Sequence, residues 1–306
     1  MCLSACSDVI GIVVSYQPDL ELLDELVSAI LPQVVSVVIV DNGSTIDMVK
    51  WKNRHEERLS VIQLGVNKGI AAAQNVGIDV ARKKGARYVV MFDQDSLPES
   101  DMIDQLFMVA ESKAAAGCAV ASVGPRYLDD RQHNPPPFIK VNGLRVDRQL
   151  CSNPDTIVEV DYLISSGCLI PMSTLSIVGG MREELFIDYV DIEWGLRAKH
   201  MGFQSFGVCA AKMRHCLGDE PILFLGRTYP LHSAQRHYYH FRNAIWLYQK
   251  PWLPLQWKLA DGYRLVLKFV FYSIFARPRG SHFRMMTLGI YHGLRRRMGS
   301  LATASI

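Results

Sequence analysis

The first 117 residues alternate continuous apolar segments with segments of helical spacing, and this alternation restricts the folds that the chain can adopt. The apolar runs, rich in β-branched residues, are Val9–Tyr16, Val34–Ser44, Leu59–Gly65 and Arg87–Phe92. Helical spacing covers Asp19–Leu31, Gly69–Gly85 and Glu99–Gly117. Continuous apolar runs are typical of strands buried on both faces, and strands separated by helices pair in parallel. The sequence therefore predicts an α/β fold with a mostly parallel, doubly wound sheet.

Charge divides the chain into two regions. Residues 1–220 contain 20 Lys/Arg and 29 Asp/Glu, whereas residues 221–306 contain 13 Lys/Arg and one acidic residue, Asp261. The second region is also rich in aromatic and aliphatic residues. We therefore expect an α/β domain over residues 1–220 and a basic, helical region over residues 221–306. A basic surface favours anionic partners such as lipid headgroups, phosphates or nucleic acid.

Cysteine usage and hydropathy bear on the cellular compartment. The seven cysteines include no CxxC pair, so the sequence predicts neither a disulfide framework nor a zinc site, and it favours a reducing compartment. Leu3–Cys6 superficially resembles a lipoprotein cleavage site, but no basic start and no apolar run precede it, so we expect no signal peptide. The apolar run Leu265–Ala276 is shorter than the roughly 20 residues that span a bilayer.

Two carboxylates follow the fourth predicted strand, Asp93 and Asp95, with only Gln94 between them. A divalent cation would relieve their repulsion. Mg²⁺ and Mn²⁺ prefer oxygen ligands, and Mg²⁺ is often held by one or two carboxylates plus substrate phosphates. Ligands of doubly wound sheets bind beyond the carboxyl ends of the strands, so these acids predict a metal–diphosphate site. The alternative is a helix start near Glu99, capped by Asp95 or Ser96.

Three further segments carry polar or small residues near strand ends. Asp41 and Asn42 can accept hydrogen bonds from a nucleobase or ribose, although Asn-Gly is equally typical of a plain turn. The segment Asn67–Gly77 is rich in small residues, which permit the approach of a flat ligand or tight packing of a helix on the sheet. Ser165–Pro171 places a small-residue loop before a predicted strand and suits an acceptor cleft.

Asp188, Asp191 and Glu193 lie among aromatic and apolar residues at the start of a predicted helix. Burial raises the pKa of a carboxyl group and makes it a better general base near neutral pH. The alternative is a helix whose first turn carries acids because the helix dipole favours them. His215, at the end of a predicted strand, is a candidate metal ligand only if the metal site exists.

A helix predicted over His232–Lys250 brings Arg236, His237, His240 and Arg242 near one another, beside two tyrosines. Arginine side chains suit phosphate oxygens. The alternative is an interfacial helix whose long cationic side chains extend to water.

In their order and spacing, these motifs resemble the inverting family 2 glycosyltransferases, and within them the bacterial rhamnosyltransferases that use dTDP-L-rhamnose. The resemblance runs from about Val9 to about Lys250 and rests on VSYQPD, VDNGS, NKGIAAAQNVG, FDQDS, LISSGCL, ELFIDYVDIEWGLRA and RHYYHFRNA. It implies a GT-A fold, Mg²⁺ or Mn²⁺, and transfer of L-rhamnose to a hydroxyl of a lipid-linked saccharide or glycolipid, of the lipopolysaccharide, O-antigen or rhamnolipid type.

The resemblance also implies residue roles. Asp191 matches the catalytic base, with Asp188 and Glu193 as alternatives because the pair that reads Glu-Asp in many relatives is Val190-Asp191 here. Trp194 and Arg197 would support that loop. The implied metal contacts are Asp93, Asp95 and His215. The implied nucleotide-sugar site comprises Ser15, Tyr16, Asp41, Asn42, Asn67, Gly69, Asn75, Asp93, Gln94 and Asp95. The implied diphosphate or acceptor contacts are Ser166, Gly167, Cys168, Arg236, Tyr238, Arg242 and Asn243.

The basic, aromatic C-terminal region predicts peripheral attachment to the cytoplasmic face of the inner membrane, and no nucleic acid partner. The alternatives are a helical domain that packs on the body and a homodimer interface. For the function, the alternatives are another donor (a galactofuranose, glucose or GlcNAc nucleotide) and a non-catalytic, membrane-bound scaffold that binds nucleotide sugar. A phosphatase with an Asp-x-Asp nucleophile fits less well, because that motif normally follows the first strand.

Overall fold

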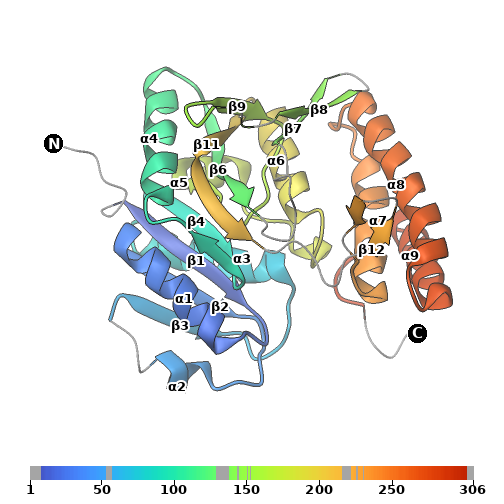
Figure 1. Ribbon diagram of the computed structural model, residues 1–306, viewed down its shortest axis with the longest axis horizontal. Coiled ribbons are helices and arrows are strands. Elements are labelled where there is room, and N and C mark those ends of the chain that lie inside the picture. Colours follow the sequence, from blue (N-terminus) through green and yellow to red (C-terminus); the bar gives the residue numbers. More distant parts are fainter. Residues whose placement is uncertain are drawn as a thin grey trace.

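The computed structural model describes residues 8–52, 57–128, 138–142, 145–149, 151, 153–215, 222–224, 227–229 and 231–301. At its centre is a nine-stranded sheet with the order β3-β2-β1-β4-β10-β6-β11-β5, in which β9 also pairs with β11 (Figure 1). Two small two-stranded sheets stand beside it, formed by β7 (Phe138–Asn142) with β8 (Arg145–Gln149) and by β12 (Ile222–Phe224) with β13 (Arg227–Tyr229).

The N-terminal half of the sheet is parallel, as the sequence predicts. It comprises β1 (Val9–Ser15), β2 (Ser36–Asp41), β3 (Leu59–Gln63) and β4 (Tyr88–Asp93). The register places Ser15 beside Asp41 and Val14 beside Asp93. The carboxyl ends of three strands therefore meet at one edge of the sheet.

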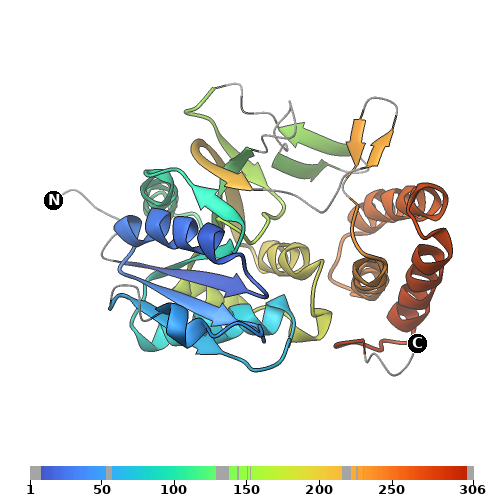
Figure 2. The ribbon, with the colours of Figure 1, turned by 60° about the horizontal axis from the view of Figure 1, so that its bottom comes forward.

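Helices cover both faces of this half, so the doubly wound arrangement is confirmed (Figure 2). Strand β1 sends Val9 and Val13 into the core shared with α1 (Leu20–Ile30), η2 (Leu31–Gln33), α2 (Met48–Lys52) and α4 (Met102–Ala115). It sends Ile10 and Ile12 into the opposite core, which contains α3 (Ile70–Lys83). A Cβ atom on Gly77 of α3 would overlap Ile12, so tight helix-on-sheet packing explains this small residue.

The second half of the sheet mixes strand directions. β10 (Leu169–Pro171) runs antiparallel to β4 and β6 (Val120–Leu128), while β11 (Gln204–His215) runs parallel to β6. β5 (Ser96–Pro98) and β9 (Ile157–Val160) pair antiparallel with β11. β5 was not predicted, and its presence shows that the helix-start interpretation of Asp95 and Ser96 is wrong. Helix α4 begins only at Met102, after an N-cap residue, Asp101, whose side chain makes no capping bond.

One covalent link contradicts the sequence prediction. Cys151 and Cys209 form a disulfide, with a Cα–Cα distance of 5.5 Å and a sequence separation of 58. Cys209 lies on β11, and its amide donates to the carbonyl of Thr156 just before β9. The pairing of β9 with β11 brings the two cysteines together, and their spacing in the sequence carries no sign of that pairing.

The C-terminal helices are α7 (Ala234–Tyr248), α8 (Leu255–Phe275) and α9 (Arg279–Leu294), which stand together at one side of the molecule (Figure 1). Helix α7 is mostly buried, and its Phe241 and Leu247 belong to the same hydrophobic core as Ile12 of β1. The interfacial-helix interpretation of residues 232–250 is therefore wrong. The domain division at residue 220 stays a prediction. Within the described ranges, no helix combines the length and apolarity needed to cross a membrane.

Candidate active site

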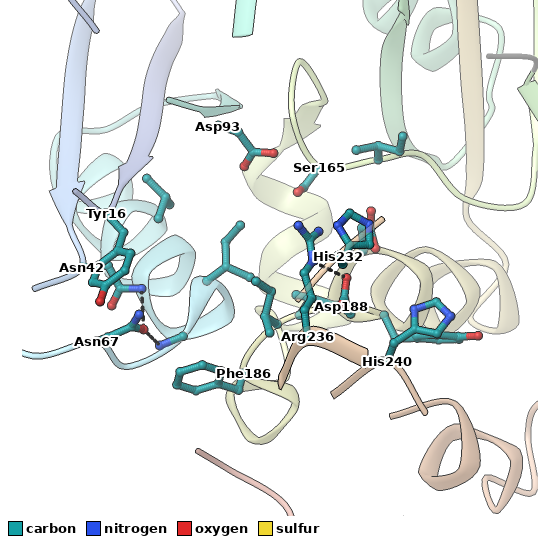
Figure 3. A pocket seen from close by; sticks show the side chains of 18 of the residues that line it. Tyr16, Asn42, Asn67, Asp93, Ser165, Phe186, Asp188, His232, Arg236 and His240 are labelled. Atoms are coloured by element: carbon teal, nitrogen blue, oxygen red, sulfur yellow. Dashed lines mark hydrogen bonds and ion pairs between the residues drawn. The ribbon is translucent and has the colours of Figure 1, made fainter. Parts of the chain in front are cut away.

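A cavity of about 610 Å³ opens at the carboxyl ends of β1, β2 and β4 (Figure 3). One wall comes from these strand ends and the loops that follow them. The facing wall comes from two parts of the chain. The first is residues 186–189, called the acidic loop below, together with the first residues of α6 (Val190–His200). The second is the start of α7. Ten predicted site residues line the cavity, namely Tyr16, Asn42, Asn67, Gly69, Asp93, Gln94, Asp95, Asp188, Asp191 and Arg236.

Amide side chains fasten the strand-end wall together. The backbone amide of Tyr16 donates to Gln94 Oε1 at 2.7 Å, which links the ends of β1 and β4. Asn42 Nδ2 donates to Asn67 Oδ1 at 3.1 Å, and the amide of Lys68 donates to Asn42 Oδ1 at 2.8 Å. The loops that follow four strands, β1, β2, β3 and β4, are thereby held around one cavity.

Ser15 and Asp41 lie just behind this wall rather than on it. Asp41 is buried and accepts hydrogen bonds from the Ser44 amide at 3.1 Å, from the Ser44 hydroxyl, and from Ser15 Oγ at 3.4 Å. These bonds fix the turn that presents Asn42. A direct contact between Asp41 and a nucleotide stays a prediction.

The Asp93–Asp95 turn is supported from below by Ser166. The amide of Asp93 donates to Ser166 Oγ at 3.0 Å, and Ser166 Oγ lies 2.6 Å from Ser96 Oγ. Gly167, with φ of +75°, donates its amide to the carbonyl of Met91 at 2.6 Å.

Ser166, Gly167 and Cys168 are buried beneath the turn, so the structure contradicts their predicted contact with diphosphate or acceptor. Burial also raises the pKa of the Cys168 thiol to about 12. Ser165, the first residue of the segment predicted to suit an acceptor cleft, lines the cavity instead.

The predicted metal ligands come together only in part. Asp93 and Asp95 line the cavity, and the backbone of His215 pairs with Ser96 in the β5–β11 register. The side chain of His215 lies outside the described residues. Among the residues that are described, no group of three His, Cys, Asp or Glu side chains is arranged to hold a metal ion.

Asp191 lies across the cavity, in the first turn of α6. Burial raises the pKa of its carboxyl group to about 6, and the negative charges of Asp188 and Asp93 act in the same direction. A hydrogen bond from the Ile192 amide to Asp191 Oδ1, 2.9 Å long, opposes this shift. A carboxyl group with a pKa near 6 can accept a proton at neutral pH and is a stronger base than an ordinary aspartate.

The acidic loop before Asp191 has a strained backbone. Phe186, Asp188 and Tyr189 have φ values of +66°, +63° and +63°, in the region that side-chain-bearing residues avoid. Such conformations persist only where surrounding contacts impose them. Here the contacts come from Asn243 of α7, whose Nδ2 donates to the carbonyls of Leu185, Ile187 and Asp188 at 2.8–2.9 Å.

Arg242 adds to this support, with bonds to the carbonyls of Leu185 at 2.9 Å, Glu184 at 3.2 Å and Gly299 at 2.5 Å. Its guanidinium also lies 4.8–5.4 Å from the ring centroids of Tyr238 and Tyr239.

Tyr238, Arg242 and Asn243 are almost completely buried and do not line the cavity. The structure therefore contradicts the prediction that they contact diphosphate or acceptor. Arg242 and Asn243 are positioning residues for the acidic loop, and the Tyr238 ring packs against Arg242. Only Arg236 of that predicted set reaches the cavity, where its Nε lies 3.3 Å from Asp188 Oδ1 (Figure 3).

Two histidines beside Arg236 also line the cavity, His232 and His240. His240 Nε2 lies 3.0 Å from Lys268 Nζ of α8. Burial lowers the pKa of His240 well below its usual value, and the nearby Lys268 charge acts in the same direction. His240 is therefore a neutral acceptor for the Lys268 ammonium group. The sequence placed His240 on a basic helix without indicating that it faces the acids.

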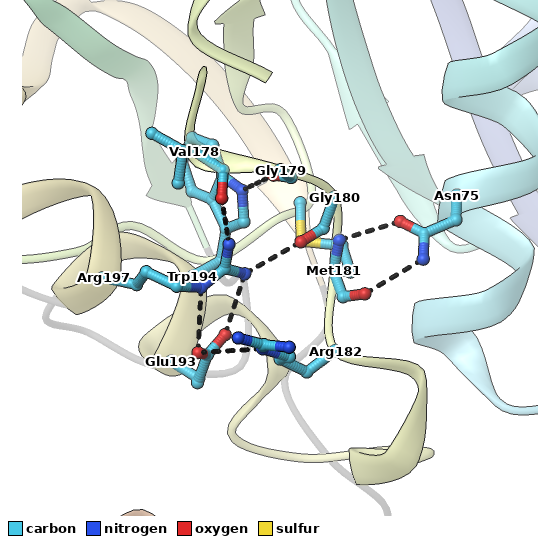
Figure 4. A network of polar contacts seen from close by, with 9 residues as sticks. All are labelled: Asn75, Val178, Gly179, Gly180, Met181, Arg182, Glu193, Trp194 and Arg197. Atoms are coloured by element: carbon cyan, nitrogen blue, oxygen red, sulfur yellow. Dashed lines mark hydrogen bonds and ion pairs between the residues drawn. The ribbon is translucent and has the colours of Figure 1, made fainter. Parts of the chain in front are cut away.

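A second network holds α6 against the preceding segment (Figure 4). Glu193 is buried and accepts from Arg197 Nε at 2.9 Å. Arg197 also donates to the carbonyls of Val178 and Gly180, and Trp194 Nε1 donates to the carbonyl of Gly179 at 2.9 Å. The supporting role predicted for Trp194 and Arg197 thus acts on residues 178–180. Glu193 is committed to this ion pair, which removes it as an alternative base.

Asn75 belongs to the same network and not to the cavity. From α3, its Nδ2 donates to the carbonyl of Met181 at 2.9 Å, and its Oδ1 accepts from the Met181 amide at 2.8 Å. Its predicted place among the nucleotide-sugar contacts is therefore wrong. These two hydrogen bonds instead attach Met181, shortly before the acidic loop, to α3, which covers the parallel half of the sheet.

A sheet with a parallel N-terminal half and paired acids at a strand end, facing a half-buried carboxylate across a cavity, is typical of the GT-A class of glycosyltransferases, and comparison with known proteins agrees. Residues 12–162 match the family model described as Glycosyl transferase family 2. The chain is 37% identical over 251 residues to a Shigella flexneri protein named dTDP-rhamnosyl transferase RfbF, covering 81% of this chain and 82% of that protein. The chain therefore belongs to glycosyltransferase family 2.

Solved structures show the same fold at low identity. S. aureus TarS 1–349 in complex with UDP-GlcNAc matches with a TM-score of 0.59 and 16% identity, over 95% of this chain and 82% of that one. GalNAc-T7 with UDP, GalNAc and Mn²⁺ matches with a TM-score of 0.63 and 10% identity, over 94% of this chain. The match spans only 56% of the GalNAc-T7 chain. The predicted GT-A fold is confirmed.

Proposed function

We propose that this glycosyltransferase moves L-rhamnose from dTDP-L-rhamnose to a hydroxyl group of a lipid-linked saccharide or glycolipid, with inversion at the anomeric carbon. The donor rests on the similarity to the enzyme named dTDP-rhamnosyl transferase. The observation that carries the chemistry is the position of Asp191, whose raised pKa of about 6 suits a base, in the same cavity as Asp93 and Asp95.

The strand-end wall is the proposed donor site. Tyr16, Asn42, Asn67 and Gly69 line the part that would receive the nucleotide. Asp93 and Asp95 would hold Mg²⁺ or Mn²⁺, and two carboxylates suffice because such ions commonly complete their shell with water and substrate phosphates. The residues fit a cation, since the carboxylates of Asp93 and Asp95 both line the same cavity. When bound, the ion neutralises negative charge on the diphosphate.

Asp191 is the proposed general base. Its carboxylate takes the proton from the acceptor hydroxyl as that oxygen forms a bond to the anomeric carbon. The bond from that carbon to the phosphate oxygen breaks at the same time, and dTDP leaves with the electron pair. One displacement inverts the configuration without a covalent enzyme intermediate, so one carboxylate base is enough, in contrast to the carboxylate pair of most glycosidases. Asp188 keeps its partner Arg236 during this step.

We further propose that the protein is attached peripherally to the cytoplasmic face of the inner membrane. The support is the charge of residues 221–306, with 13 Lys/Arg against one acidic residue. Each cation near an anionic leaflet contributes about 1 kcal/mol to binding. A lipid-linked acceptor would then be presented at the same surface.

The test is nucleotide release. Purified protein is incubated with dTDP-, UDP- and GDP-sugars, with Mn²⁺, Mg²⁺ or EDTA, with and without a rhamnose-accepting glycolipid extract. We expect metal-dependent dTDP release from dTDP-L-rhamnose, lost in Asp95→Ala. Release from another nucleotide sugar alone would overturn the rhamnose donor. Nucleotide binding without release from any donor, with acceptor present, would indicate the non-catalytic scaffold.

A further inference from the structure

Helix α8 is apolar on the side that faces away from the protein. Six large side chains on this outward face are between 48% and 68% exposed, namely Leu255, Leu259, Tyr263, Val266, Val270 and Ile274. Their spacing of three or four residues places them along one side of the helix. The opposite side packs inward through Trp257, Leu265 and Tyr272.

This pattern differs from that of an ordinary surface helix, whose outward side is polar. The outward face runs almost the full length of α8, about 30 Å at 1.5 Å per residue. Exposed apolar surfaces of this extent mark sites of interaction with a membrane or another protein.

The charge around the outward face indicates which partner covers it. Lys258 and Arg264 lie on the same helix, with Lys258 Nζ donating to the carbonyl of Lys250 at 2.8 Å. The exposed Arg277, Arg279 and Arg284 follow at its C-terminal end. The one acidic residue after position 220, Asp261, lies on α8 but accepts hydrogen bonds from the hydroxyls of Tyr189 at 2.8 Å and Tyr248 at 2.6 Å. The surroundings of the outward face are therefore cationic.

A cationic rim around an apolar stripe fits an anionic lipid surface, where acyl chains receive the apolar side chains and headgroups receive the cations. A second copy of this chain fits less well, because it would bring two cationic surfaces together.

We propose that the outward face of α8 binds an anionic bilayer, with the helix lying in the plane of the headgroups. This proposal adds a membrane-binding surface to the proposed function. The binding itself does not depend on that function; only its purpose, access to a lipid-linked acceptor, rests on it. Because α8 lacks the apolar length to cross a membrane, its contact is with the surface. Phe283 of α9, 51% exposed, is a further apolar residue close to the same cationic end.

The binding face is close to the cavity. On the inner side of α8, Asp261 bonds to Tyr189, which lines the cavity two residues before Asp191. Lys268 of the same helix bonds to His240, another lining residue. One helix, about 10–12 Å thick, therefore separates the proposed lipid surface from the cavity wall.

The experiment is vesicle sedimentation with the full chain and no donor. The vesicles are phosphatidylcholine alone or phosphatidylcholine with about one quarter phosphatidylglycerol, which provides a negative surface. We expect the native protein to sediment with the anionic vesicles only. In the double variant Val266→Glu/Val270→Glu, the bound fraction should fall about tenfold or more, because two carboxylates enter the apolar stripe.

The matched control is Ile177→Glu on α5 (Met172–Val178), an apolar residue 61% exposed on another part of the molecule. It should bind vesicles as the native protein does. The proposal is overturned if the native protein stays in the supernatant, or if the double variant binds as well as the native protein. It is also overturned if light scattering shows a native dimer that the double variant converts to a monomer without loss of vesicle binding.

Donor chemistry is measured separately, as dTDP release with the rhamnose-accepting glycolipid extract but without vesicles. The double variant should keep the native rate, because its substitutions lie outside the cavity. Vesicle binding by a protein that releases no nucleotide would sustain the lipid face and count against the proposed function. A double variant that loses vesicle binding but keeps nucleotide release supports both.

Discussion

The two walls of the cavity are built in different ways. The strand-end wall consists of loops that leave neighbouring parallel strands, so hydrogen bonds between strands already fix where Asn42 and Asp93 lie. The acidic loop belongs to no strand, and its strained backbone depends on side chains from α7, more than 50 residues later in the sequence. The first wall is therefore held by local topology, and the second by long-range contacts of a few polar side chains.

Because the two walls are held differently, substitutions at Asp191, in the acidic loop before it or in its supports should reduce turnover. Substitutions in the strand-end wall should instead weaken donor binding. Asp191→Asn should have the largest effect. The amide cannot accept the hydroxyl proton, so kcat should fall about 10²–10⁴-fold. Donor affinity, measured by calorimetry with dTDP, should change little. An unchanged kcat would remove Asp191 as the base.

Asn243→Ala should come next. The carbonyls of Ile187 and Asp188 lose the side-chain donor of Asn243, while that of Leu185 keeps Arg242. A buried, unsatisfied carbonyl group costs about 1–3 kcal/mol. We expect kcat to fall about 10- to 100-fold through misplacement of Asp191, with a lower melting temperature.

The matched control for Asn243→Ala is Tyr238→Phe, which removes only the hydroxyl that bonds to His292. A structural role without positioning would lower the melting temperature of Asn243→Ala and leave its kcat intact at low temperature. That outcome would contradict the assignment.

The pH dependence probes the environment of the same carboxylate. In the metal-free protein, burial, with Asp188 and Asp93, raises the pKa of Asp191 to about 6, and the protonated carboxyl group is inactive. Activity, measured as kcat/KM at saturating metal, should rise with pH and fall about tenfold per unit below its midpoint. The midpoint should lie below about 6, because a cation on Asp93 offsets the charge that helps to raise the pKa of Asp191. Asp188→Asn removes one of the charges that raise the pKa, and the rise should then move to lower pH. A midpoint unchanged in that variant would contradict the proximity of the two acids.

Asn67→Ala tests the other wall and should have the smallest effect. It removes the acceptor for Asn42 Nδ2 and for the Gly69 amide. Because the strands still hold the loops in place, we expect the KM for the donor to rise a few-fold, in line with about 1 kcal/mol for a hydrogen bond, while kcat is nearly native. A large fall in kcat would mean that the two walls are not independent.

The sequence predicted the strand-end wall well for a physical reason. A buried strand is recognised from its apolar run, and the residue after its end is then placed at the ligand-binding edge, as Asn42 and Asp93 are. It predicted Asp191 because acids among aromatic residues are unusual, and the resemblance to a family then selected the position.

The features that the sequence did not predict correctly share one physical cause, which is that they depend on partners far away in the sequence. Arg242 and Asn243 are polar residues on a helix, a pattern that normally indicates solvent or ligand contact, yet their partners are backbone carbonyls of a distant loop. The prediction for Asn75 was wrong for the same reason, because its side chain is hydrogen-bonded to the backbone of Met181. Strand β5 is three residues long and exists only because β11 lies beside it. The disulfide likewise follows from strand pairing, so none of these features has a local signal.

At Gly69 the two walls of the cavity are in direct contact through backbone atoms. Its φ is +88°, a Cβ atom there would lie 2.6 Å from the carbonyl oxygen of Phe186, and the neighbouring Ile70 amide donates to that oxygen at 2.7 Å. The spacing between the proposed donor site and the proposed base is therefore fixed by backbone atoms rather than by side chains. A redesign of this enzyme for a bulkier sugar would therefore have to preserve the backbone contact between Gly69 and Phe186. The additional space would have to come from side chains that can be replaced, such as Tyr16.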